Sequence, residues 1–147
     1  MFSFFKQLFD QYKTYRETDF SFEYAEDMEV KTEGDVISVF KKNNAIGMFQ
    51  MTKVSLKESG QTFEELLNHN IKSVEEENIS YDTILLNGLK GIMFQRKEAN
   101  QEVDHWQLGN AKLYFYFSYQ YVAEHSDEKL EEEKEEFFRL IRQLRVN

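Results

Sequence analysis

The chain is 147 residues long and carries 27 acidic against 18 basic side chains, for a formal net charge of -9. That length predicts one domain with its own core. The acidic balance argues against binding nucleic acid or an anionic membrane surface, since both need a concentrated basic face. There is no cysteine, which excludes disulfides and cysteine-ligated zinc and is typical of a reducing compartment. We therefore expect a cytoplasmic protein with a single domain over residues 1–147.

The first segment, residues 1–16, is predicted to be an amphipathic helix because apolar residues recur at helical spacing. These candidate docking residues are Phe2, Phe5, Phe9 and Tyr12. Such a helix can pack on its own domain or on a sister subunit, dock a partner, or lie on a membrane. We expect docking or homo-oligomerisation. No apolar run approaches the roughly 20 residues that span a bilayer, so no transmembrane segment is predicted.

Three short strands and a helix are predicted next. The strands cover residues 20–24, 36–40 and 46–54 and form an antiparallel meander. The helix begins at Thr62, because Thr62 and Glu65 have the spacing of a capping box. Its apolar stripe is Phe63, Leu66, Leu67, Ile71 and Val74.

Four more strands are predicted in the second half. Asn87-Gly88 is a strong hairpin signal between residues 81–86 and 89–96, because both turn positions favour positive φ. Residues 102–108 form a further strand. The strand at 113–123 carries rings on both sides, with Leu113, Phe115, Phe117, Tyr119 and Tyr121 opposed to Tyr114, Tyr116, Ser118 and Gln120. Rings on both sides predict a place in the middle of a sheet.

The last helix is predicted to begin near Ser126. Its acidic first half and basic end suit the helix dipole, and we interpret the acidic run as a solvated face. The apolar stripe is Leu130, Phe137, Phe138, Ile141 and Leu144. The predicted class is therefore α+β, with an antiparallel sheet of about seven strands and helices packed on it.

The order of several stretches resembles a known fold. They are Phe20-Ser-Phe-Glu-Tyr24, Met48-Phe-Gln-Met51, the helix from Thr62, the aromatic strand at 113–121, and the terminal Phe137-Phe-Arg-Leu-Ile-Arg-Gln-Leu144. This order is similar to that of the PsbP-like superfamily, which includes PsbP, a Ran-binding nuclear-import factor and the bacterial DcrB-like proteins. The resemblance implies an α/β/α sandwich over residues 18–146, with the first helix outside it. It also implies a function in binding other proteins and assigns no site residue.

Catalytic and metal-binding patterns are weak in this sequence. The three histidines lack zinc-motif spacing. Glu102, Asp104 and His105 are close in sequence, but strand alternation sends His105 to the opposite face. Ser118 has no nucleophile elbow around it, and the six glycines do not cluster as a phosphate loop requires. We expect a protein that is not an enzyme and uses no cofactor or metal.

Binding is the remaining function class. Tryptophan and tyrosine are enriched where proteins recognise each other. The candidate surface is Trp106, Asp104, His105, Tyr114, Tyr116, Tyr119 and Tyr121, although Trp106 could equally cap the core. We predict a non-catalytic protein-interaction module of adaptor, chaperone or toxin-neutralising type whose partner is another protein. The alternative is a carrier of a hydrophobic small molecule or lipid in a sheet–helix groove.

Overall fold

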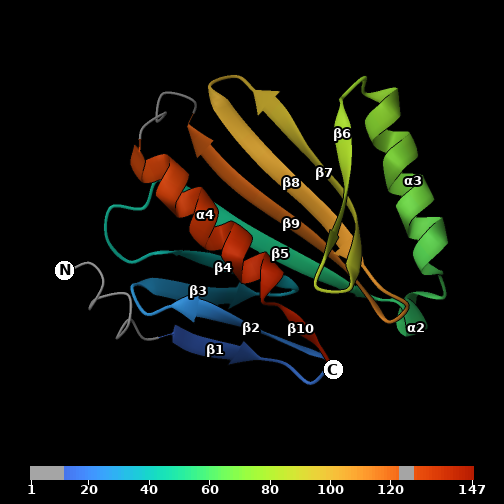
Figure 1. The fold of residues 1–147 in the computed structure, drawn as a ribbon, viewed down its shortest axis with the longest axis horizontal. Helices are drawn as coiled ribbons and strands as arrows, with labels where there is room; N and C mark the ends of the chain where they lie inside the picture. Colours follow the sequence, from blue (N-terminus) through green and yellow to red (C-terminus); the bar gives the residue numbers. More distant parts are fainter. Residues whose placement is uncertain (1–11, 123–127) are drawn as a thin grey trace.

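The structure is a computed structural model that describes residues 12–122 and 128–147 (Figure 1). Its strands and helices confirm the α+β class. In chain order they are β1 (Tyr12–Arg16), β2 (Phe20–Ala25), β3 (Met28–Glu33), β4 (Val36–Lys41), β5 (Gly47–Ser55), α2 (Leu56–Ser59), α3 (Phe63–Glu76), β6 (Tyr81–Leu86), β7 (Leu89–Glu98), β8 (Gln101–Gly109), β9 (Leu113–Val122), α4 (Glu128–Arg142) and β10 (Arg145–Val146).

Within the described residues, the main sheet has seven strands in the order β3-β4-β5-β9-β8-β7-β6, all paired antiparallel. The aromatic strand β9 lies in its middle, as its two-sided pattern predicts. Asn87 and Gly88 both have positive φ in the β6–β7 turn, which is the conformation a two-residue hairpin requires. Each end of the sheet is therefore an edge strand, β3 at one end and β6 at the other.

Two layers cover this sheet, one on each face (Figure 1). Helix α4 and the small sheet β1-β2-β10 lie on one face, where Phe20 meets Phe115 edge-on with ring centroids 5.3 Å apart. Helix α3 lies on the other face, where Leu66 and Val74 pack toward β9 and β7. The predicted cap is present, since the Thr62 hydroxyl accepts the Glu65 N–H at 3.1 Å.

Two sequence expectations need correction. The predicted first helix does not reach Tyr12, because Tyr12 lies in strand β1 and pairs with Ala25 of β2; Phe2, Phe5 and Phe9 lie outside the described residues. The main sheet has the expected size but a different membership. The segment 20–24 joins the small sheet, and β3, which sequence patterning did not predict, takes the edge position. Strand β3 alternates charged residues with others, so it lacks the apolar run that marks a strand.

Candidate interaction surface

The α4 side of strand β9 is a closed aromatic core. Phe115, Phe117 and Tyr119 are at most 1% exposed. Phe137 of α4 stacks on Phe49 of β5 at a centroid distance of 4.9 Å. These rings hold the centre of the sheet to α4 and leave no free ring surface there.

Glu133 is a buried carboxylate in α4, only 1% exposed. It accepts hydrogen bonds from the Gly47 N–H at 2.8 Å, the Ile46 N–H at 3.1 Å and the Tyr119 hydroxyl at 2.8 Å. Burial and the bond to this carboxylate raise the pKa of Tyr119 far above its ordinary value. The interpretation of the acidic run as wholly solvated is therefore wrong at Glu133, which fastens the helix to the start of β5.

Tyr121 lies at the rim of the same face in a polar cluster. Its hydroxyl donates to Glu102 at 2.8 Å and accepts from Lys134 and from Gln95. Lys134 also lies 3.6 Å from Asp104. Burial alone would lower the pKa of Lys134, but Tyr121 and Asp104 raise it overall. These polar groups supply one another's hydrogen-bond and ion-pair partners, so the cluster links α4 to β8 and β9 at the rim of this face.

The α3 side of β9 is covered in part. Tyr114 is fully buried beneath Phe63 of α3, and desolvation raises the pKa of its phenol to about 12. Tyr116 is half-buried, and its hydroxyl accepts a hydrogen bond from the Asn70 side-chain amide at 3.0 Å. Both tyrosines therefore pack under the helix.

His105 lies on this α3 face, opposite the face of Glu102 and Asp104, as strand alternation predicts. Its ring stacks on Phe94 at 4.8 Å, and its Nε2 is 3.5 Å from Arg96, which is paired with Glu77, the residue that caps the end of α3. Burial and the neighbouring guanidinium lower its pKa to about 4. His105 is thus neutral at pH 7 and stacks on Phe94, over whose ring Arg96 lies.

The predicted surface is therefore largely internal. Trp106, Tyr114, Tyr119 and Tyr121 are at most 5% exposed, so the expectation that these rings face a partner is wrong. Covering elements on both faces enclose them. Trp106 caps the core, the alternative that the sequence left open. Asp104, His105 and Tyr116 remain partly exposed but lie on different faces.

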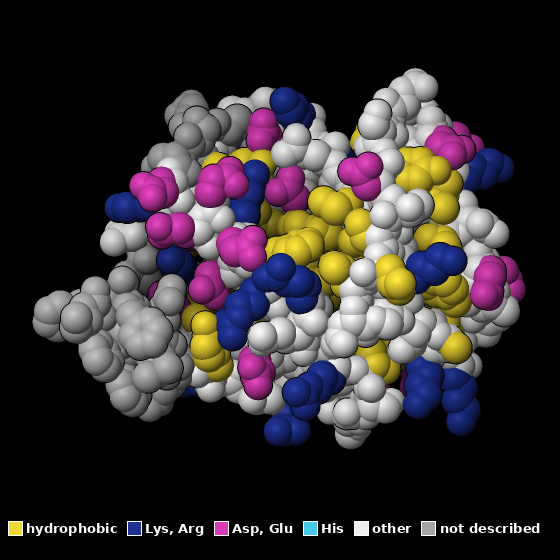
Figure 2. All heavy atoms as spheres, viewed as in Figure 1, with side chains coloured by type: hydrophobic (Ala, Val, Ile, Leu, Met, Phe, Trp, Pro, Cys, Tyr) yellow, Lys and Arg dark blue, Asp and Glu magenta, His cyan; other side chains and the backbone are white. Residues whose placement is uncertain are grey.

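An open apolar area lies elsewhere, on the β6–β7 hairpin beside α4. We call it the shelf and define it by four half-buried side chains that pack against the core: Ile84, Leu86, Met93 and Phe138. Figure 2 shows this apolar area at the middle of the face, bordered by charged groups. Trp106 pairs with Met93 at the back of the shelf, and within residues 12–122 and 128–147 its indole N–H has no hydrogen-bond partner.

The sequence contains a signal for the shelf. Residues 84–86 read Ile-Leu-Leu just before the Asn87-Gly88 turn. A strand with one solvated side should alternate there, so three consecutive apolar residues indicate apolar surface on both sides. The structure bears this out, with Leu85 on the other side from Ile84 and Leu86 and 70% exposed.

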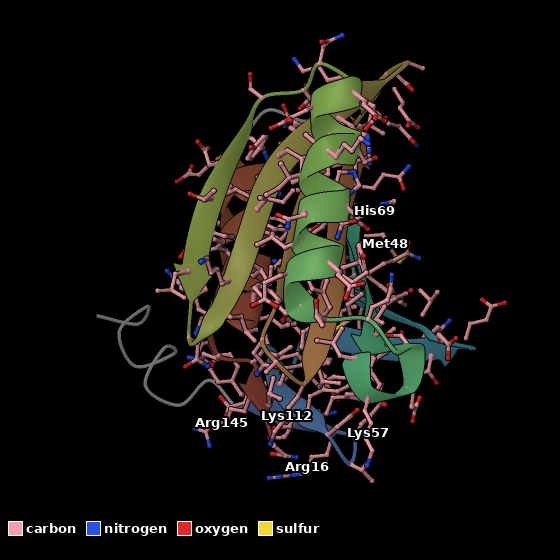
Figure 3. All side chains as sticks on the ribbon, turned by 90° about the vertical axis from the view of Figure 1, so that its right-hand side faces the viewer. Arg16, Met48, Lys57, His69, Lys112 and Arg145 are labelled. Carbon is pink, nitrogen blue, oxygen red and sulfur yellow. The ribbon has the colours of Figure 1, made fainter. Side chains whose placement is uncertain are left out.

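A second feature lies at the end of the molecule that holds the β8–β9 turn. Figure 3 shows four basic side chains reaching outward there: Arg16, Lys57, Lys112 and Arg145. A hollow of about 730 Å³ opens beside the start of α3, lined partly by Leu56, Phe63 and Leu113. Basic groups therefore gather at one end of an acidic chain, a grouping that their scatter in the sequence concealed.

Two negative findings concern the described residues. Among residues 12–122 and 128–147, no three His, Cys, Asp or Glu side chains converge to hold a metal ion. None of the helices in the same part of the chain has the length and apolar character needed to cross a bilayer.

Comparison with solved structures gives the fold. The solution structure of cyanobacterial PsbP (CyanoP) from Synechocystis superimposes with a TM-score of 0.58 at 10% identity over 94% of each chain. This chain has a PsbP-like fold. A crystal structure of a protein from Bacteroides thetaiotaomicron is also similar to the chain described here. The two superimpose with a TM-score of 0.67 at 14% identity over 92% of this chain. The chain spans only 48% of that protein.

Comparison by sequence does not identify a family. No protein-family model matches the chain, and no curated protein matches it. Identities of 10% and 14% show the fold alone, and a PsbP-like fold does not by itself assign a function. The functional argument therefore rests on the surfaces described above.

Proposed function

We propose that the protein is a non-catalytic module that binds another protein, of the adaptor, chaperone or toxin-neutralising type. The observation that carries the proposal is the shelf. Its side chains, three from β6 and β7 and Phe138 from α4, pack against the core but are only partly buried. Rigid apolar groups with a polar surround are typical of the central part of a protein interface.

Affinity capture with two matched variants tests the proposal. Met93 belongs to the shelf, whereas Met48 is an exposed methionine on the α3 side of the molecule, 39% exposed and visible in Figure 3. We expect the wild-type protein and Met48→Asn to retain the same protein partner and Met93→Asn to lose it. Capture of no stable partner, or equal capture by both variants, contradicts the proposal.

A carrier of a hydrophobic small molecule is the second candidate, favoured by the hollow of about 730 Å³ beside α3. Ligand pockets fall in the range of about 300–1,000 Å³. Native mass spectrometry of freshly purified protein separates the two candidates. A co-purifying mass of lipid size that disappears in Leu56→Lys supports the carrier, and a bare chain favours the protein-binding module.

A further inference from the structure

Among residues 12–122 and 128–147, strand β6 is an edge of the main sheet that pairs with β7 alone. Leu86 and Leu89 flank the two-residue turn and form a hydrogen-bonded pair of the antiparallel ladder. Hydrogen-bonded and non-hydrogen-bonded pairs alternate along the ladder, so the N–H and C=O groups of Thr83 and Leu85 point away from β7. Both residues are exposed. Outward N–H and C=O groups on an edge strand are a template for another strand.

The opposite edge, β3, has the same hydrogen-bonding potential but different side chains. Its exposed positions are Lys31, Thr32 and Glu33, and Glu29 is half-buried. Charged residues on an edge oppose pairing with another chain. On β6 the corresponding stretch is Ile84-Leu85-Leu86, with Asp82 as its one charge. The two edges of one sheet thus differ in the feature that controls strand addition.

The shelf is continuous with the β6 edge. Ile84 and Leu86 belong to both, since their side chains lie on the α4 side of the strand. A strand added beside β6 places alternate side chains on that same side. Its apolar positions would then lie against the shelf, and its main chain would satisfy the outward groups of Thr83 and Leu85.

Charge decides between a second copy and a different partner. Each copy carries a net charge of -9, so two copies repel each other. Asp82 lies at the start of β6, and Glu75 accepts a hydrogen bond from Tyr81 there; Lys90 faces Leu85 from β7, one strand in from the free edge. The carboxylates at the start of β6 and the end of α3 therefore complement a basic segment at that end of the edge, while Arg142 lies over Phe138 at the far side of the shelf.

We propose that an extended segment of a basic partner protein pairs antiparallel with β6, with alternate apolar side chains on the shelf. This inference rests on the proposed binding function and specifies its geometry. Main-chain pairing would supply affinity, and the shelf would select apolar residues at every second position. Basic residues between them would point to the α3 side and meet the acidic end of α3, whereas Asp82 lies on the same side as Ile84 and Leu86.

The test uses a phage-displayed library of random peptides of about ten residues, enough to cover a strand of typical length. We expect enriched peptides to alternate apolar residues with Lys or Arg. The corresponding synthetic peptides should bind Thr83→Pro at least about tenfold more weakly than wild type, since proline removes an outward donor and tenfold is worth about 1.4 kcal/mol. Thr32→Pro, the matched exposed change on β3, should leave affinity unchanged within about twofold.

A second variant guards against local distortion by proline. Leu85→Lys keeps the backbone donor but places a cation at the edge, and we expect the same loss for basic peptides. Acidic enriched peptides, no enrichment, or equal binding to Thr83→Pro and Leu85→Lys overturns the inference. So does a wild-type dimer in sedimentation that Thr83→Pro dissociates, which assigns the edge to a second copy. Peptides that depend on Met93 but not on Thr83 or Leu85 overturn strand addition while leaving the proposed function standing.

Discussion

The centre of the main sheet and its β6 end are built from similar apolar residues but differ in how far other elements cover them. At the centre, α4 covers β5 and β9, and it is held there by the stacking of Phe137 on Phe49 and by the hydrogen bonds that Glu133 accepts. At the β6 end, Ile84 and Leu86 have the same apolar character but are only partly buried by the part of the chain that the structure describes. The contrast teaches that coverage, rather than composition, decides which apolar strand is core and which is surface.

The largest effect is expected from removing the ring that joins α4 to the centre. Phe137 is fully buried and stacked on Phe49, so Phe137→Ala should lower the free energy of unfolding by about 3–5 kcal/mol. Urea denaturation followed by circular dichroism measures this. Leu85→Ala, on the exposed β6 edge, should change the same quantity by no more than about 0.5 kcal/mol. Equal losses of unfolding free energy in the two variants would contradict the claim that the centre of the sheet is core and the β6 edge is surface.

A second test removes the carboxylate at the centre. Glu133→Ala leaves two backbone N–H groups and the Tyr119 hydroxyl without their acceptor, which should cost about 3 kcal/mol of unfolding free energy. Glu132, next to it on the exposed side of α4, is the control, and Glu132→Ala should stay within about 0.5 kcal/mol. If Glu132→Ala costs as much, the buried network does not hold α4 in place.

The α3 side gives a smaller, pH-dependent effect. The pKa of His105 is lowered from 6.5 to about 4 in the folded protein. Between these values the unfolded state binds more protons, so stability should fall as the pH drops from 6.5 toward 4. With a discount for partial exposure, the loss is roughly 1–2 kcal/mol.

Two histidine variants isolate this contribution from the carboxylates that titrate in the same range. His105→Gln should reduce the fall in stability between pH 6.5 and 4, the two pKa values of His105. His69→Gln, a change at an exposed histidine on α3, should leave the profile unchanged. Identical profiles for wild type and His105→Gln would show that His105 is not held neutral by its surroundings.

The smallest expected effect on stability comes from the shelf. Met93 is half-buried, so Met93→Asn should cost about 1 kcal/mol or less while abolishing partner capture. A thermal melt and the capture assay on the same preparation separate the two effects. A variant that melts much earlier and also loses the partner would place Met93 in the core rather than on a binding surface.

Sequence patterning predicted much of the fold. Period-two alternation placed β9 in the middle of the sheet, Asn87-Gly88 gave the hairpin, and Thr62 gave the helix cap. It missed β3, whose charged residues suit an exposed edge and hide the strand signal. It also assigned Tyr12 to a helix because spacing alone does not show that Tyr12 pairs with β2.

The candidate surface was less predictable for a physical reason. The tyrosines of β9 look like a recognition surface in sequence, which does not show that α3, from an earlier part of the chain, and α4, which follows β9, fold over its two faces. Burial of Tyr119 also depends on Glu133, a residue that reads as part of a solvated acidic run. The one local sign of the true open surface was the break in alternation at residues 84–86.

Amide hydrogen exchange of the free protein and of its complex with the captured partner tests the central claim most directly. We expect Thr83 and Leu85 to exchange rapidly in the free protein and slowly in the complex, with the exchange of Thr32 on β3 unchanged. Unchanged exchange along β6 in a stable complex, or new protection along β3 instead, would contradict the claim that the open end of the sheet is the binding surface.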